Sequence, residues 1–309
     1  MPRALVFPGQ GAQYVGMGSE LAQRFPSARR LFDEADRVLG FALSDIMANG
    51  PEADLTRTDV SQPAILVASA MSLAVAQEAI NPLTCAAVAG LSLGEYTALY
   101  ASGVLSFADA VKLVRLRGEA MQAAADAVPG GMVVLIGADE TSAAALCAEA
   151  AGGEVLAVAN LNCPGQVVVS GARGACVRAV ELAKKHGIRM AKPLPVAGAF
   201  HSPLMAPAAD RLRAALAGVR LKDPQWPVYS NVTAKPVTSA SEVPELLVAQ
   251  LTSPVRWADS VVAMHAAGVD SFLELGPGKT LGGMITRTVK DVPCRNLDVA
   301  ADANALAAS

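Results

Sequence analysis

One serine of the chain lies in a pattern that is typical of nucleophilic catalysis. Gly90-Leu91-Ser92-Leu93-Gly94 has the form GxSxG, follows an apolar run that predicts a strand, and precedes residues that favour a helix. A strand-to-helix turn this tight needs small flanking residues and lifts the serine hydroxyl clear of the sheet. The N–H of Leu93 then lies at a helix N-terminus, where it can bind a developing oxyanion. The pattern predicts that Ser92 carries an acyl group covalently, with a structural turn as the alternative.

A serine nucleophile needs a base, and the candidates are the three histidines of the chain. His186 and His265 each lie near the end of a predicted helix, where a cation interacts favourably with the helix dipole. His201 lies instead in Gly-Ala-Phe-His-Ser-Pro, in a loop between an apolar strand and a helix that begins near Pro203. Because loops on a rigid scaffold often carry catalytic residues, His201 is predicted to be the base. A loop histidine with a purely structural role is the alternative, and the sequence identifies no acid as the third member of a triad.

The predicted helix from Phe107 to about Val128 carries an arginine on its apolar side. At roughly 100° per residue, one face of this helix is polar and holds Lys112, Arg115, Glu119 and Gln122. Arg117 falls on the opposite, apolar stripe. A buried guanidinium needs an anion or several acceptors, so either a core carboxylate or a substrate carboxylate is expected beside it. In the second case the guanidinium of Arg117 donates two N–H···O bonds to the substrate carboxylate. This suits an acyl group with a free acid at its far end.

The elements that position these residues are predicted to form an α/β fold. Strands are expected at 4–7 and 83–89, and helices at 64–79 and after Ser92, which is the order of a sheet covered on both faces. After Pro129 the order changes to β-α-β-β-α-β, the ferredoxin-like order, with strands at 132–136, 155–161, 166–170 and 189–194 and helices at 140–151 and 173–186. We therefore expect a large domain over residues 1–128 and 197–309 and an inserted ferredoxin-like domain over 129–196. The Ala-rich tail after Leu297 is expected to be frayed.

Composition excludes several other classes of protein. Hydrophobic residues make up 52% of the 309 residues and charged residues 17%, so the chain can bury a large core. The net charge of −3 and the absence of a Lys/Arg block argue against a nucleic-acid partner. Five scattered cysteines predict neither a disulfide framework nor a structural zinc site. No signal peptide is evident, and the longest apolar run, 64–76, is too short to span a bilayer. A protein of the cytoplasm, or of a plastid or other organelle matrix, is expected.

Two glycine-rich segments resemble nucleotide-binding loops but depart from the patterns. Gly276-Pro277-Gly278-Lys279-Thr280 ends like a P-loop, yet Leu273 stands where the first glycine is required. Gly9-Gln10-Gly11 is followed by Tyr14 where GxGxxG requires glycine. We predict no nucleotide site, and we interpret the second segment as the loop after the first strand, from which a second oxyanion donor can come.

Six motifs then follow one another along the chain: FPGQGAQ at 7–13, GLSLGEY at 90–96, Arg117-Gly118, NLNCPGQVVVSG at 160–171, GAFHSPLM at 198–205, and Gln250 before SPVRW. In these motifs, which extend over nearly the whole length, the chain resembles the malonyl-CoA:acyl carrier protein transacylases and the related acyltransferase domains of fatty acid and polyketide synthases. The resemblance implies an α/β-hydrolase-like large domain with a ferredoxin-like insertion. It also implies malonyl transfer to the phosphopantetheine thiol of acyl carrier protein, without a bound cofactor or metal, by a protein that is commonly a monomer.

The resemblance assigns a role to each matching residue. Ser92 is the acylated serine, His201 the base, Arg117 the partner of the malonyl carboxylate, Gln10 and Leu93 the oxyanion donors through their N–H groups, and Gln250 the residue whose carbonyl orients the histidine. Phe200 accompanies malonyl selection in the polyketide domains, since a ring there fills the space that an α-methyl group needs. Carrier proteins of this pathway are acidic, and Lys184, Lys185 and Arg189 are candidates for contacting one.

One position departs from the majority of the family, and three other functions stay open. Leu91 stands where many members have histidine, in GHSLG. A thioesterase or esterase of the α/β-hydrolase type could use the same GxSxG and histidine, as could an acyltransferase for another acyl-CoA. A non-enzymatic relative that binds malonyl-CoA is the third possibility, but Ser92, His201 and Arg117 together argue against it.

Overall fold

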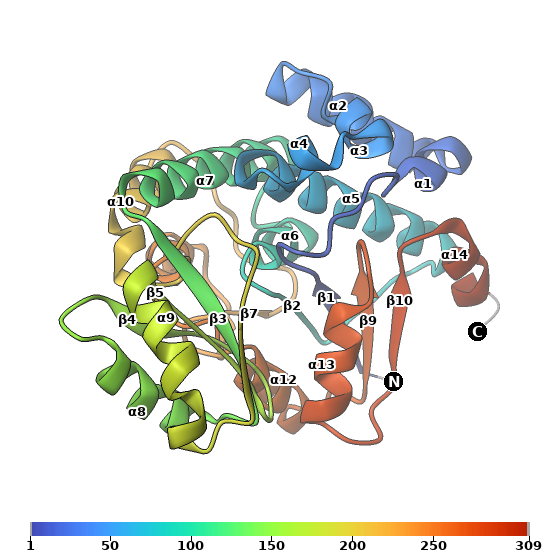
Figure 1. The fold of residues 1–309 in the computed structure, drawn as a ribbon. Coiled ribbons are helices and arrows are strands. Elements are labelled where there is room, and N and C mark those ends of the chain that lie inside the picture. Colours follow the sequence, from blue (N-terminus) through green and yellow to red (C-terminus); the bar gives the residue numbers. More distant parts are fainter. Residues whose placement is uncertain (1, 308–309) are drawn as a thin grey trace.

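A computed structural model describes residues 2–307 and contains two separate sheets (Figure 1). The larger has six strands in the order β10-β9-β1-β2-β7-β8. Its strands are β1 (Arg3–Phe7), β2 (Ala87–Gly90), β7 (Val228–Tyr229), β8 (Pro236–Val237), β9 (Ser271–Leu275) and β10 (Cys294–Leu297). The pairs among β10, β9, β1, β2 and β7 are parallel, and only β8 is antiparallel to its neighbour. The structure thus confirms a mixed α/β fold with a parallel sheet.

Helices cover both faces of this sheet, because successive side chains of β1 point to opposite faces and both sets are apolar. Leu5 and Phe7 pack in one core with α5 and α7, and Ala4 and Val6 pack in the other with α12 and α13. The helices of this region are α1 (Ser19–Arg24), α2 (Pro26–Leu39), α3 (Leu43–Asn49), α4 (Glu52–Thr56), α5 (Thr58–Ala79), α6 (Gly94–Ala101), α7 (Phe107–Ala127), α10 (Ala206–Leu216), α11 (Val243–Gln250), α12 (Trp257–Ala266), α13 (Thr280–Thr288) and α14 (Ala300–Ala307). Short 3₁₀ turns, η2 (Pro203–Met205) and η3 (Ala240–Glu242), precede α10 and α11.

The smaller sheet has four antiparallel strands in the order β4-β5-β3-β6. Along the chain its elements are β3 (Gly130–Ile136), α8 (Glu140–Ala150), β4 (Leu156–Cys163), β5 (Gln166–Ala172), α9 (Arg173–Leu182), the 3₁₀ turn η1 (Ala183–His186) and β6 (Met190–Pro193). This is the β-α-β-β-α-β order that the sequence predicts. Both helices pack on one face, over Val133 and Val169, while Met132 and Val168 on the other face join the core of the larger sheet.

Three elements differ from the sequence prediction. β2 begins at Ala87 rather than at 83, because residues 83–86 are irregular and only Ala87–Gly90 pair with β1. α5 begins at Thr58, six residues earlier than predicted. By length and composition it could span a membrane, but 94% of its apolar window is buried inside the protein, which is typical of a core helix. The tail is not frayed through residue 307, because Ala300, Ala303 and Leu306 of α14 bury one face in the core that contains α5; residues 308–309 lie outside the described part.

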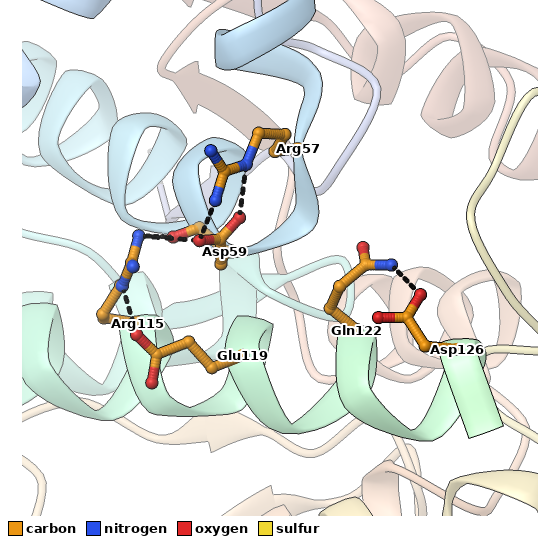
Figure 2. Close-up of polar contacts among 6 residues, drawn as sticks. All are labelled: Arg57, Asp59, Arg115, Glu119, Gln122 and Asp126. Atoms are coloured by element: carbon orange, nitrogen blue, oxygen red, sulfur yellow. Dashed lines mark hydrogen bonds and ion pairs between the residues drawn. The ribbon is translucent and has the colours of Figure 1, made fainter.

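The polar face of α7 is held by ion pairs, as Figure 2 shows. Arg115 donates to Glu119 at 2.6 Å on its own helix and contacts the Asp59 carboxylate at 3.1 Å on α5. Arg57 contacts the same Asp59 at 2.9 Å. These contacts fix α7 against the start of α5 and leave the opposite face of α7, with Arg117, directed into the protein.

Candidate active site

The predicted nucleophile lies in a sharp turn between β2 and α6. Ser92 has a backbone φ of 51°, in the left-handed region that residues other than glycine seldom adopt. A Cβ atom on Gly90 would overlap the backbone of Gly94, and one on Gly94 would overlap the carbonyl of Phe7. The two glycines of GxSxG are therefore required by the close approach of the backbone.

His201 lies against Ser92, the predicted nucleophile. Its Nε2 is 2.7 Å from the Ser92 hydroxyl oxygen, and its Nδ1 is 2.8 Å from the backbone carbonyl of Gln250. Because a carbonyl can only accept, Nδ1 carries the hydrogen and Nε2 presents a lone pair to the serine hydroxyl. Gln250 is the last residue of α11, so its carbonyl belongs to the unpaired, partly negative end of that helix. This carbonyl lies where the acid of a triad would contact the histidine, and the sequence identifies no such acid.

The surroundings keep His201 neutral. Burial and the nearby charge of Arg117 lower the pKa of His201 from 6.5 to about 4, while the bond to Gln250 opposes this shift. At neutral pH the imidazole can therefore accept the serine proton.

Arg117 is buried and directed at Ser92. Its side chain is 1% exposed, and its Nη2 donates to the Ser92 hydroxyl and to the Gln250 side-chain oxygen, both at 3.0 Å. Its Nη1 donates to Gln62 on α5 at 2.8 Å. A Cβ on Gly118 would overlap the backbone of α5, so this glycine lets the two helices approach. The structure therefore confirms the burial of Arg117 and brings it to Ser92.

The partners of Arg117 are neutral. Within residues 2–307 no carboxylate oxygen lies within 4.0 Å of its guanidinium, so the core ion pair that the sequence left open is absent there. The Tyr96 ring lies 5.5 Å from the guanidinium carbon, and the buried Nε has no partner in the described part of the chain. Burial lowers the pKa of Arg117. The site thus holds a desolvated cation that a ligand carboxylate would neutralise.

The two predicted oxyanion donors flank the nucleophile in different ways. Leu93 follows Ser92 as the residue before α6, and Gln10 lies in the loop after β1 on the wall of a cavity. Neither N–H has a hydrogen-bond partner in the part of the chain that the structure describes. Both are therefore free to bind an oxygen atom of a ligand.

The cavity beside Ser92 has a volume of about 720 Å³. Leu91 lines it from the turn after β2, Phe200 and His201 line it from the loop before η2, and Asn160 and Asn162 line it from β4 of the smaller sheet. Leu91, the one departure from the resemblance, therefore forms part of the cavity wall. A cavity of this size can hold a drug-sized ligand, and it opens onto the nucleophile.

Three functional candidates were missed by the sequence reasoning. Asn231 accepts from the Ser92 N–H at 2.6 Å, Glu95 accepts from the Gln250 side-chain amide at 2.6 Å, and Gln62 accepts from Arg117. All three are buried polar residues. The signals were present: Glu95 lies within the GLSLGEY motif, Gln62 lies just before the long apolar run of α5, and Asn231 lies two residues after β7.

The other two histidines do not line the cavity beside Ser92, and of the P-loop-like segment only Thr280 does. His186 Nε2 is 2.9 Å from Glu149, and His265 Nδ1 is 2.9 Å from the carbonyl of Val269. The Gly276–Thr280 segment connects β9 to α13. However, the Glu274 carboxylate accepts from the N–H groups of Leu281 and Gly282 at 3.0 and 2.9 Å and so occupies the helix end that a phosphate would need.

Comparison with known proteins gives a family match over nearly the whole chain. Residues 4–306 match the family described as acyl transferase domain. The chain is 45% identical over 285 residues to a malonyl CoA-acyl carrier protein transacylase of Bacillus subtilis (strain 168), which covers 92% of this chain and 89% of that one. It is 42% identical over 303 residues to the protein of the same name from Haemophilus influenzae, covering 98% and 97% of the two chains.

Solved structures agree with this match. An acyl carrier protein S-malonyltransferase from Vibrio cholerae superposes with a TM-score of 0.95 at 42% identity, covering 99% of this chain and 100% of that one. A malonyl-transacylase solved in complex with a type II PKS acyl-carrier protein superposes with a TM-score of 0.95 at 40% identity, covering 100% and 99%. The fold of the described residues is therefore that of known acyl transferases.

Proposed function

Because this chain belongs to the acyl transferase domain family, we propose that it transfers a malonyl group from malonyl-CoA to the phosphopantetheine thiol of an acyl carrier protein through an acyl-enzyme on Ser92. One observation carries the proposal. The Ser92 hydroxyl is contacted at the same time by a neutral base, His201 at 2.7 Å, and by a buried cation without a carboxylate partner, Arg117 at 3.0 Å. This arrangement suits an acyl group that ends in a carboxylate.

The first half of the reaction forms the acyl-enzyme. His201 Nε2 takes the hydroxyl proton while the Ser92 oxygen attacks the thioester carbonyl, and the N–H groups of Gln10 and Leu93 donate to the resulting oxyanion. The carbon–sulfur bond then breaks, and the CoA sulfur leaves with the proton from His201. The partly negative Gln250 carbonyl stabilises the imidazolium in between.

The second half repeats these steps in reverse order. The carrier-protein thiol gives its proton to His201 and attacks the serine ester, and Ser92 regains the proton as its bond to the malonyl carbon breaks. Arg117 binds the malonyl carboxylate throughout, so the acyl group keeps one orientation. No bound cofactor or metal takes part.

Specificity for malonyl over bulkier acyl groups is assigned to Phe200. Its buried ring lines the cavity directly beside His201. A ring there occupies the space that an α-methyl group would need, which is worth about 1–3 kcal/mol of discrimination.

The proposal extends to architecture and setting. The parallel sheet with its helices, residues 1–128 and 197–309, is an α/β-hydrolase-like domain, and residues 129–196 form an inserted ferredoxin-like domain. The strand order of the smaller sheet supports the second assignment. The protein acts as a cytoplasmic monomer. For the acidic carrier protein, Lys184 and Arg189 are better candidates than Lys185, which contacts Glu149 at 2.5 Å.

The test is acylation by malonyl-CoA followed by digestion and mass measurement. A malonyl mass on the peptide that contains Ser92, absent from the Ser92→Ala variant, is expected. An adduct elsewhere, or none, overturns the assignment. Adding a carrier protein then separates transfer from hydrolysis: an excess of free malonate over malonyl-carrier protein would favour the esterase alternative.

A further inference from the structure

The loop after β7 reaches the nucleophile turn from the neighbouring strand. β7 pairs with β2 in parallel, with Ala89 opposite Tyr229. Continuing this register by two residues places Asn231 opposite Leu91. Asn231 is fully buried, although it lies beyond the last paired residues of β7. Its position therefore continues the strand alignment past the end of the sheet.

The side chain of Asn231 makes the bonds that a paired backbone would make. In a parallel ladder, a residue donates to the carbonyl before its opposite residue and accepts from the N–H after it. Asn231 Nδ2 donates to the carbonyl of Gly90 at 2.8 Å, and its Oδ1 accepts from the N–H of Ser92 at 2.6 Å. These are the residues before and after Leu91. The side-chain amide of Asn231 thus continues the hydrogen-bond ladder between β2 and β7 at a position where the backbone of Asn231 no longer pairs with β2.

The backbone of Asn231 is engaged elsewhere. Its N–H donates to Glu95 at 3.3 Å, and its carbonyl accepts from the N–H of Arg256 at 2.8 Å. Glu95 also accepts from the Gln250 amide, which in turn donates to the Ser92 carbonyl at 2.9 Å. The peptide groups on both sides of the Ser92 side chain are therefore held by buried amides.

This support matters because Ser92 has a positive φ. A residue other than glycine persists in that conformation only where its surroundings hold it. The bonds from Asn231 span the turn from Gly90 to Ser92, so they fix the direction in which the hydroxyl leaves the backbone.

We propose that Asn231 is a positioning residue for the nucleophile: its side-chain amide replaces a backbone partner and holds the Ser92 hydroxyl within reach of His201. The inference rests on the proposed function only in that Ser92 is the nucleophile. It does not depend on malonyl being the acyl group.

The experiment compares Asn231→Ala and Asn231→Asp with the parent protein. The aspartate keeps the size but puts an acceptor against the Gly90 carbonyl. Asn296→Ala is the matched control, because Asn296 Nδ2 also donates to a backbone carbonyl at 2.8 Å, that of Gly278, on another strand. Three quantities are measured: the rate of Ser92 labelling by a fluorophosphonate, kcat and KM with malonyl-CoA, and the midpoint of thermal unfolding.

Both Asn231 variants should label Ser92 about 10- to 100-fold more slowly, because a small misplacement of a reacting group costs this much. The value of kcat should fall with the labelling rate, and KM should stay within about threefold. Asn296→Ala should lose stability without slower labelling. A folded Asn231→Ala that labels at the parent rate overturns the inference, and Asn231→Asp decides in the same way if the alanine variant does not fold. A parent that labels at Ser92 but does not transfer malonyl overturns the proposed function alone.

Discussion

Replacing Arg117 by alanine should separate malonyl transfer from acetyl transfer. The guanidinium is 1% exposed and no carboxylate among residues 2–307 pairs with it directly, although the buried Glu95 acts on it at longer range, so a substrate carboxylate would be its direct counter-charge. A hydrogen bond to a charged group contributes roughly 1.5–3 kcal/mol, and a fork makes two of them. We therefore expect a loss of about 3–6 kcal/mol, or roughly 160- to 25,000-fold in kcat/KM for malonyl-CoA. Acetyl-CoA lacks the carboxylate, and its kcat/KM should change by less than about tenfold.

The assay is transfer from each acyl-CoA to one carrier protein, with two further variants. Arg115→Ala removes a guanidinium two residues away on the same helix, one that is paired with Asp59 and Glu119 (Figure 2). It should leave the ratio of malonyl to acetyl transfer unchanged. Arg117→Lys keeps the charge without the fork and should fall between the parent and the alanine variant. Thermal unfolding of each variant shows whether the protein loses stability when the side-chain oxygens of Gln62 and Gln250 no longer accept hydrogen bonds from Arg117.

Equal losses for the two acyl groups would refute this reasoning. Arg117 would then act through its bond to the Ser92 hydroxyl, or as a core residue, and the acid at the end of the acyl group would need another partner.

Three further predictions concern the groups around the nucleophile. Because the pKa of His201 is about 4, the acylation rate should hold from pH 8 down to about 5 and fall only below that, as the base becomes protonated; a midpoint near 6.5 would contradict this burial effect. Burial raises the pKa of Glu95 from 4.5 to about 7. The folded protein then binds the proton of the Glu95 carboxyl more tightly than the unfolded chain does. The stability that this proton contributes at low pH is therefore lost as pH rises through 7. In the Glu95→Gln variant, Tm should accordingly decrease less between pH 5 and pH 8 than in the parent protein. An equal decrease in both proteins would contradict the raised pKa of Glu95. Phe200→Ser should raise methylmalonyl relative to malonyl transfer by about 10- to 200-fold, measured by competition between the two acyl-CoAs.

The sequence predicted what depends on local pattern. The turn at Ser92 follows from two glycines between a strand and a helix, and the burial of Arg117 follows from its angle on the helix. His201 was reached by elimination, because the other two histidines lie near predicted helix ends. The smaller sheet was predicted strand by strand, since each of its segments is short and bounded by a turn residue.

Other features depend on contacts that the local pattern does not encode. The carbonyl that orients His201 comes from the end of α11, and any residue type can supply a carbonyl, so only the resemblance to a family pointed to Gln250. Asn231 and Gln62 come from separate elements and meet the site only after folding. The alanines of the tail are weakly apolar and predict fraying, but two of them, Ala300 and Ala303, together with Leu306 are enough to pack in the core that contains α5.

The bonds of this site join residues that are distant along the chain. Ser92 contacts His201 across 109 positions, Asn231 across 139 and Gln250 across 158. Closing loops of that length is slow and follows the formation of local structure. The nucleophile turn would thus reach its final geometry only after β7, α11 and the return from the smaller sheet have docked. Recovery of fluorophosphonate labelling during refolding would therefore report the completion of the whole chain, later than the recovery of helical signal.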